Sequence, residues 1–419
     1  MEKKKKILRF SLLAIFSFCF FTSNVFAASK YYLSVGTDYG SLGGNSTPEA
    51  NWVGGTLKLN GYTGSTVVQP TYESFNSQVL GRYTLESDVL YFLGHADSDH
   101  IAWNYQAKNG NYAVGVRNMA SDSYIGIYRM TGIGRYNMGK VKLAIFQGCN
   151  TAANSNSNLP KYADEQGADV AIGWASAIHR SDSLPWIQKF FSNGFFPNNV
   201  NNMVNYANSF TYVTSAIKNT RIYGNGNTSV FPASATQLMT VNIDDRKNII
   251  NEPYNTNLSS LQEIKSKIVS LINENMDTKI NANDFVMEAV QNDNGKIYDL
   301  YFTINGVKTS LGYTAFTNAD GTMITDIYDN MNNYEPEALK TEKLLTIKNK
   351  LNQVTPAKAK AINKIATDTV KAENFNAIAN IVDVFNYYDV VEEKLYQITL
   401  VKVELPTGAY SLIDYKTEL

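Results

Sequence analysis

Two apolar runs determine how the first half of this chain folds: Val89-Leu90-Tyr91-Phe92-Leu93 and Val141-Lys142-Leu143-Ala144-Ile145-Phe146. Both have the length of a strand, and both are apolar on nearly every residue, as burial on two faces of a parallel sheet requires. Around them, residues 28–231 alternate further strand-like runs with helical patterns. This alternation predicts an α/β domain whose mostly parallel sheet is covered by helices.

Chemically reactive side chains follow directly after these two runs. Gly94 and His95 follow the first, and Gln147, Gly148 and Cys149 follow the second. In an open parallel sheet, the carboxyl ends of neighbouring strands share the crevice in which ligands bind. A cysteine attacks carbonyls as its thiolate, which a nearby imidazole stabilises. The pattern therefore predicts a catalytic dyad of Cys149 and His95.

The first residues of the chain are typical of a secretory signal. A basic head precedes an apolar run from Phe10 to Phe21, and small residues end at Ala27, so we expect a signal peptide over 1–27 and a secreted or cell-surface protein. Of the two cysteines, Cys19 lies in this segment and Cys149 follows it, which excludes an intramolecular disulfide after cleavage. The net charge of −1 and the lack of a later long apolar segment argue against nucleic-acid binding and a membrane span in the mature protein.

The second half of the chain has a different periodicity. A loose region at 232–257 predicts a linker. Residues 258–332 combine a helix, with capping-box spacing at Ser259 and Ser260, with three strand-like runs over 285–291, 296–304 and 307–316. Hairpin turn residues at Asn294-Gly295 and Asn305-Gly306 separate these runs, so we expect a helix on an antiparallel meander. Residues 333–419, with a helical region over 337–381, echo this pattern and predict a second small α+β module.

The residues after the two apolar runs support a family resemblance. The segments Leu90-Tyr91-Phe92-Leu93-Gly94-His95-Ala96 and Phe146-Gln147-Gly148-Cys149-Asn150 resemble the paired motifs of caspase-like peptidases, which include caspases, gingipains, clostripain and CHAT-domain proteins. The separation of 149 − 95 = 54 residues is similar to that family's spacing of about 50. The resemblance implies a three-layer α/β/α sandwich over 28–231 and a cysteine endopeptidase that acts on protein or peptide substrates.

The same resemblance implies roles for individual residues. Cys149 would attack the scissile carbonyl, His95 would protonate the leaving amine, and the N–H groups of Cys149 and Ala96 would form the oxyanion hole. The substrate pocket would be lined by Gln147, Trp174, Ala175 and Ser176. No cofactor is implied, although calcium activates some members of the family. The C-terminal modules are similar in pattern to the PepSY-type modules of secreted peptidases, which implies intramolecular inhibition.

Alternative interpretations remain open at this stage. Ala96 stands where the family usually has glycine, and a need for positive φ there would strain the oxyanion hole. The chain would then be a catalytically silent caspase-like scaffold that acts as a secreted or surface interaction module. A metal site is a further interpretation, based on His95, Asp97, Asp99 and His100. These residues lack the helical spacing of the ligands in a zinc peptidase. We expect His100 and His179 to be surface or loop residues.

Overall fold

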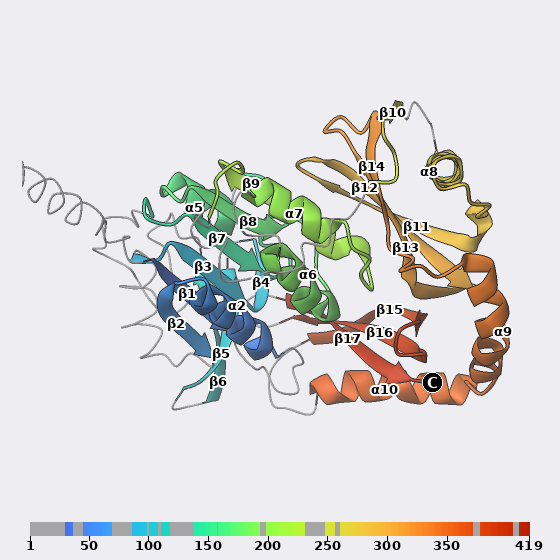
Figure 1. Ribbon diagram of the computed structural model, residues 1–419. Helices are drawn as coiled ribbons and strands as arrows, with labels where there is room; N and C mark the ends of the chain where they lie inside the picture. Colours follow the sequence, from blue (N-terminus) through green and yellow to red (C-terminus); the bar gives the residue numbers. More distant parts are fainter. Residues whose placement is uncertain are drawn as a thin grey trace, which may run out of the picture.

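The structure is a computed structural model that describes most of the chain after residue 29 (Figure 1). The described ranges are 30–36, 45–68, 86–98, 100–107, 110–117, 138–156, 158–192, 198–230, 248–255, 260–371, 378–404 and 410–419. The predicted signal peptide lies outside these residues, and of the predicted linker only 248–255 is included. No helix among them is both long enough and apolar enough to cross a membrane.

The first sheet has six strands in the order β2-β1-β3-β7-β8-β9. Its strands are β1 (Tyr31–Gly36), β2 (Thr63–Val68), β3 (Val89–Leu93), β7 (Leu143–Gln147), β8 (Val170–Trp174) and β9 (Thr220–Gly224). The first five are parallel to their neighbours, and only β9 is antiparallel. The two apolar runs form β3 and β7, which are fully buried and lie side by side at the centre.

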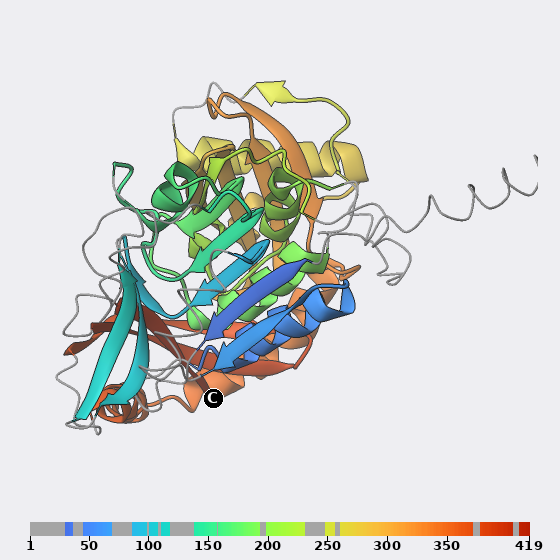
Figure 2. The same ribbon diagram turned by 90° about the vertical axis from the view of Figure 1, so that its left-hand side faces the viewer.

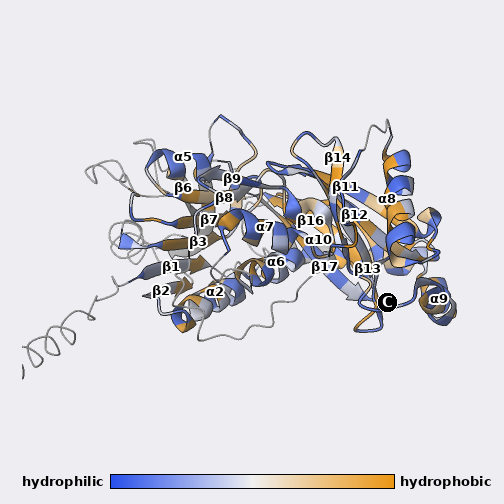
Figure 3. Ribbon diagram, turned by 45° about the horizontal axis from the view of Figure 1, so that its top comes forward, coloured by the Kyte–Doolittle hydropathy of each residue, from blue (hydrophilic) through white to orange (hydrophobic). Residues whose placement is uncertain are grey.

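Helices cover both faces of this sheet. One buried apolar cluster joins the sheet to α2 (Thr47–Leu59), α6 (Arg180–Ser192) and α7 (Val200–Asn208). A second cluster joins the opposite face to α5 (Leu159–Glu165). Apolar strands therefore lie between helices whose outer surfaces are polar (Figure 3). The predicted mixed α/β architecture with a mostly parallel sheet is confirmed.

Helix α6 contains a proline in its interior. It starts at Arg180, and Pro185 lies inside it. Proline has no N–H to donate, so this position costs one helical hydrogen bond. Buried packing of Trp186, Phe190 and Phe191 stabilises the helix despite that loss.

The region from 260 to 329 forms a helix and an antiparallel meander. Helix α8 (Leu261–Met276) starts with a capping box in which Ser260 and Glu263 bond reciprocally, as predicted. Its partners are strands β11 (Phe285–Asn292), β12 (Gly295–Ile304), β13 (Val307–Thr317) and β14 (Met323–Asp329). Asn305 and Gly306 both have positive φ in the β12–β13 turn, which confirms the predicted hairpin chemistry.

The last part of the chain repeats the order of helix followed by meander. It contains α9 (Pro336–Asn352), α10 (Pro356–Lys371) and the antiparallel strands β15 (Ile378–Asp389), β16 (Lys394–Glu404) and β17 (Tyr410–Glu418). The predicted helical region extended to residue 381, whereas residues 378–381 belong to β15. Antiparallel pairing of residues 378–381 with residues 401–404 of β16 stabilises the extended backbone there.

One large second sheet unites all these strands with part of the N-terminal region. Parallel pairing of β13 with β15 joins the two meanders, and β17 pairs with β4 (His95–Asp97). Strands β5 (His100–Ala107) and β6 (Gly110–Arg117) follow, so the sheet has eleven strands in total with β10 (Tyr254–Asn255). Figure 2 shows the cyan hairpin beside the red C-terminal strands. The segment that carries His95 is therefore shared between the two sheets.

Candidate active site

The predicted reactive residues follow two adjacent strands. Strands β3 and β7 are paired in parallel register, with Leu93 opposite Gln147. One step further, the N–H of Gly94 donates to the carbonyl oxygen of Gln147 at 3.4 Å. The segments that lead into His95 and Cys149 thus leave the sheet at the same edge, side by side.

Gly148 shows how tightly these two segments pack. A Cβ added at this position would lie 2.4 Å from the Cβ of Ala96 and 2.9 Å from the carbonyl oxygen of Gly94. Such contacts are far inside van der Waals separation, so only glycine allows the backbone on either side to approach this closely. The requirement for glycine here is steric, since Gly148 is not among the described glycines with positive φ.

Cys149 is buried beneath its neighbours. It is 1% exposed and belongs to the apolar cluster that includes Trp174 and Ile178. Its sulfur nevertheless has a polar contact, because the backbone N–H of Ile178 donates to Sγ at 3.4 Å. The thiol in turn donates to the carbonyl oxygen of Ile178 at 3.7 Å, so the backbone of one residue holds the sulfur through both its N–H and its C=O group. His95 is buried to the same degree, at 1% exposed.

The turn that holds Cys149 is tied to the loop after β8. Asn150 has a φ of 58°, a left-handed conformation that asparagine tolerates better than most residues. Its N–H donates to the Ser176 carbonyl oxygen at 3.0 Å, and Thr151 Oγ1 accepts from the Trp174 N–H at 3.0 Å. Strained backbone of this kind clusters at functional sites. No role was predicted for Asn150 or Thr151 from the sequence, although an asparagine directly after the cysteine is a signal for this conformation.

Ala96 adopts an ordinary strand conformation. It lies in β4, pairs with Ile101 of β5 and with Tyr410 of β17, and is not among the described residues with positive φ. The concern that alanine would be strained here was therefore wrong. Its side chain fits against Gly148, so the small residue at 148 complements the methyl group at 96.

The four residues expected to line a substrate pocket differ in their surroundings. Gln147 is buried; its Oε1 accepts from the Tyr91 hydroxyl at 2.6 Å, and its Nε2 donates to the Ser183 carbonyl oxygen at 3.0 Å. Trp174 is a core side chain that packs edge-on against Trp186 and donates to the Ile217 carbonyl oxygen. Ala175 and Ser176 are partly exposed and bond to the loop near residue 216. Of the four residues, only Ala175 and Ser176 have accessible surface.

His179 lies in the loop between β8 and α6, as one of the two expected placements had it, but it is buried near the site rather than at the surface. It is 4% exposed and directly follows Ile178, whose N–H bonds the sulfur. Burial is the main cause that lowers its pKa below the ordinary value for histidine, so the imidazole is neutral near pH 7. The sequence offered no signal for this position, because the burial depends on β17.

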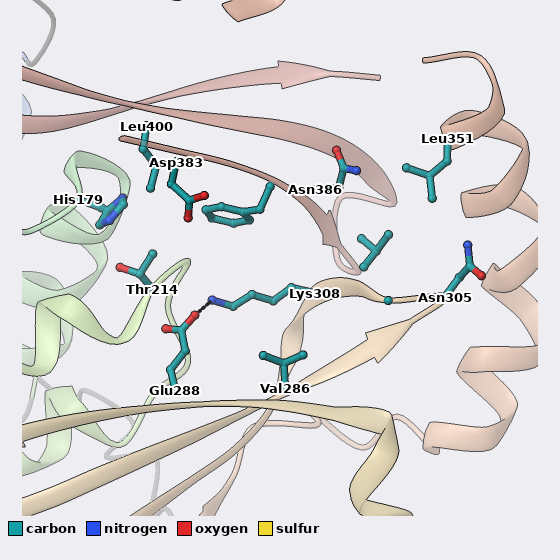
Figure 4. A pocket seen from close by; sticks show the side chains of 13 residues that line it. His179, Thr214, Val286, Glu288, Asn305, Lys308, Leu351, Asp383, Asn386 and Leu400 are labelled. Carbon is teal, nitrogen blue, oxygen red and sulfur yellow. Dashed lines mark hydrogen bonds and ion pairs between the residues drawn. The ribbon is translucent and has the colours of Figure 1, made fainter. Parts of the chain in front are cut away.

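A cavity of about 490 Å³ borders His179. Its lining comes from three parts of the chain and includes Thr214, Glu288, Lys308 and Asp383. Figure 4 shows the His179 ring at one end and the ion pair of Lys308 with Glu288, at 2.5 Å, across the middle. Neither Cys149 nor His95 lines this cavity.

Ionic contacts organise the loop and helix that follow His179. Arg180 forms a two-pronged ion pair with the buried Glu49 of α2, and its Nη2 lies 2.6 Å from Oε2. Asp182 is buried and accepts N–H bonds from Val213 and Thr214. Burial, with a smaller contribution from Asp414, raises the pKa of Asp182 to about 7.

Strand β17 lies across both loops of the candidate site. Tyr410 pairs with Ala96, and Leu412 forms a bridge with His179. Further along, Oδ1 of Asp414 accepts the N–H of Ser181 at 3.0 Å. Ala96, which follows His95, and His179, which follows the residue that bonds the sulfur, are therefore both paired with a strand from the other end of the chain.

Metal binding has little support in the part of the chain that the structure describes. No three His, Cys, Asp or Glu side chains gather there in a way that could hold an ion. Asp99 and the side chain of His100, which entered the metal interpretation, lie outside that part.

Comparison with known proteins found no family model that matches the chain and no curated protein that matches it.

Proposed function

We propose that this chain is a secreted cysteine endopeptidase of the caspase-like type, with Cys149 as nucleophile and His95 as general acid and base. The observation that supports this most is the contact of Gly148 with Ala96 and Gly94. It brings the segment of the imidazole against the segment of the thiol, at the carboxyl ends of two paired parallel strands. Ligands of open α/β sheets bind at this edge.

The proposed reaction is hydrolysis through an acyl-enzyme. The Cys149 thiolate attacks the substrate carbonyl, and a carbon–sulfur bond forms as the carbonyl π electrons move to oxygen. Collapse of this intermediate breaks the peptide C–N bond, and the His95 imidazolium gives its proton to the leaving amine. Water, deprotonated by His95, then hydrolyses the thioester and restores the thiol. The Ile178 N–H, which bonds Sγ at 3.4 Å, holds the sulfur in place for this attack.

The supporting geometry extends to the proposed specificity pocket. Gln147 is held by Tyr91 on one side and by the first turn of α6 on the other. A residue whose amide is oriented at both ends is preorganised, which is typical of positions beside a reaction centre. The partly exposed Ala175 and Ser176 would then flank the substrate, whereas Trp174 would act from behind as core.

A catalytically silent caspase-like scaffold is the second candidate function. The observation that favours it is the 1% exposure of both Cys149 and His95, because a reaction centre must admit its substrate. In this case the protein would act as a secreted or surface interaction module, and the buried thiol would be a packing residue.

Hydrolysis of casein and of a peptide library distinguishes the two candidates. We expect cleavage by the wild-type chain, a loss of about 10³-fold or more in Cys149→Ala, and a loss of about 10²- to 10⁴-fold in His95→Ala. Rates are measured as kcat/KM with fluorogenic substrates chosen from the library.

His179→Ala tests which histidine acts as the base, because this histidine is also buried near the sulfur but follows a different strand. His179→Ala should retain the wild-type dependence of kcat/KM on pH. His95→Ala should lose the part of this dependence that reports the ionisation of the base. Absence of cleavage both in the wild-type chain and in an Asp414→Ala variant would favour the silent scaffold, because Asp414 belongs to the strand that covers the site.

A further inference from the structure

Strand β17 is bonded on both of its edges near the candidate site. On one side all nine of its residues pair with β16. On the other side Tyr410 pairs with Ala96, and Leu412 forms a bridge with His179. The N-terminal half of β17 thus lies between the C-terminal sheet and the two loops that flank Cys149, as the red strand beside α6 and β4 in Figure 1.

The backbone positions that β17 uses are those that an extended peptide needs. Proteins bind extended peptides by strand addition, in which main-chain groups of an open edge bond to the main chain of the ligand. Ala96 directly follows His95, and His179 directly follows the residue whose N–H bonds the sulfur. A substrate that presents its carbonyl to Cys149 would lie along this edge.

We propose that the edge formed by Ala96 and His179 is a binding site for an extended polypeptide, and that β17 occupies it here as an internal inhibitor. This proposal rests on the proposed function of Cys149. Strand β17 has the properties of such a ligand. Its backbone is extended, and along one edge it pairs with Ala96 and forms a bridge with His179. Burial of Cys149 and His95 then describes a closed state rather than an inert site.

A carboxylate contact closes the cover at its far end. Ser181 lies in the first turn of α6, where backbone N–H groups have no partner within the helix. Asp414 of β17 accepts the Ser181 N–H and places a negative charge at the positive end of that helix. This side-chain contact can be removed without changing the backbone pairing of β17 with β16.

Alkylation of Cys149 by iodoacetamide measures the cover without reference to activity. Labelling of the full chain is followed by mass spectrometry of the peptide that contains Cys149. We expect slow labelling of the wild-type chain and a rate about fivefold higher in Asp414→Ala, because a helix cap contributes this much to an equilibrium. Asp414→Asn keeps an acceptor for Ser181 and should restore most of the slow rate.

Glu418→Ala is the matched control on the same strand. It removes a carboxylate whose ion pair with Lys394 is exposed and far from both loops, so its labelling rate should equal that of the wild type. Circular dichroism and thermal melts check that each variant is folded. Wild-type labelling as fast as that of the unfolded chain, or equal rates in wild type and Asp414→Ala, would overturn the proposal.

Peptide hydrolysis by the same variants separates this inference from the proposed function. Faster labelling together with faster hydrolysis in Asp414→Ala supports both. Faster labelling without hydrolysis in any variant supports the cover and rejects the peptidase. Hydrolysis by a wild-type chain that Asp414→Ala leaves unchanged, with unchanged labelling, rejects the cover alone.

Discussion

Among the contacts that join the N-terminal α/β region to the C-terminal sheet, two differ in the kind of group that forms them. The first is a buried polar cluster in which Lys218 bonds Asp299 and Thr314, while Ser215 donates to Asp299 at 2.6 Å. The second is the edge of β17, which uses isolated backbone pairs and the Asp414 carboxylate. We call them the buried anchor and the β17 edge.

The difference lies in what each contact loses on opening. Lys218 and Asp299 are 0% and 1% exposed as side chains, so separating them would leave charges in an apolar interior. At the β17 edge Ala96 and His179 are buried, but Ser181, Leu412 and Asp414 are partly exposed, so these groups can exchange their bonds for bonds to water or to another strand. We therefore expect the C-terminal sheet to stay attached through the buried anchor while the β17 edge opens.

Breaking the buried anchor should have the largest effect. Lys218→Ala leaves the Asp299 carboxylate buried with fewer partners, and we expect a loss of about 3–5 kcal/mol in the free energy of unfolding. Urea denaturation followed by fluorescence measures this. Lys364→Ala is the control, because its pair with Asp368 is exposed and should contribute little to stability. Similar losses in both variants would contradict the distinction.

Filling the space at Gly148 should have an intermediate effect, transmitted to the β17 edge. Gly148→Ala forces its methyl group against Ala96, which pairs with β17 on its other edge. We expect a loss of about 1–3 kcal/mol in stability and faster alkylation of Cys149, measured by thermal melts and labelling. The control is Gly55→Ala, a position in α2 with no atom within 4 Å of an added Cβ, where alanine should stabilise by up to about 1 kcal/mol.

A change of one pH unit should have the smallest effect, and it acts on the β17 edge. Because burial raises the pKa of Asp182 to about 7, the folded protein keeps a proton that the unfolded chain loses near pH 4. Stability from this group is present at low pH and falls as the pH rises toward 7, by at most about 1.4 kcal/mol per pH unit. Asp182→Asn should flatten the dependence of the unfolding free energy on pH between 5 and 7.

The charged neighbours of Asp182 make this experiment specific. Asp414 on β17 raises its pKa, and Lys308 on β13 lowers it, as do the bonds from Val213 and Thr214. Ser183→Ala, an uncharged change one residue away, should keep the wild-type slope. The comparison between variants cancels the titration of His179, which both retain. An equal slope in Asp182→Asn and wild type would show that this carboxyl does not report on the edge.

Local chemistry explains which elements could be predicted from the sequence. The strands between 285 and 317 agree with the predicted runs to within one or two residues, because Asn-Gly turns limit each of them. Both central strands were also predicted, since their apolar residues need burial on two faces. The positions of His95 and Cys149 at one edge follow from those strands and from the parallel pairing.

Contacts between distant segments explain what the sequence missed. Nothing near His179 indicates burial, because its cover is Leu412, 412 − 179 = 233 residues away. The role of Ala96 was misjudged for the same reason, since its conformation depends on pairing with β5 and β17. Trp174 was expected in a substrate pocket, but the neighbouring Trp186 and Ile217 make it a core residue.

The pairing of Ala96 with Tyr410 also bears on the order in which the molecule assembles. These residues are 410 − 96 = 314 positions apart, and contacts of such separation form late because the intervening chain must be ordered first. Strand β3 and its neighbours meet much sooner along the chain. We expect a folding intermediate in which the edge of β4 is unpaired and the thiol at 149 reacts with reagents in solution. The thiol becomes protected when β17 pairs with β4.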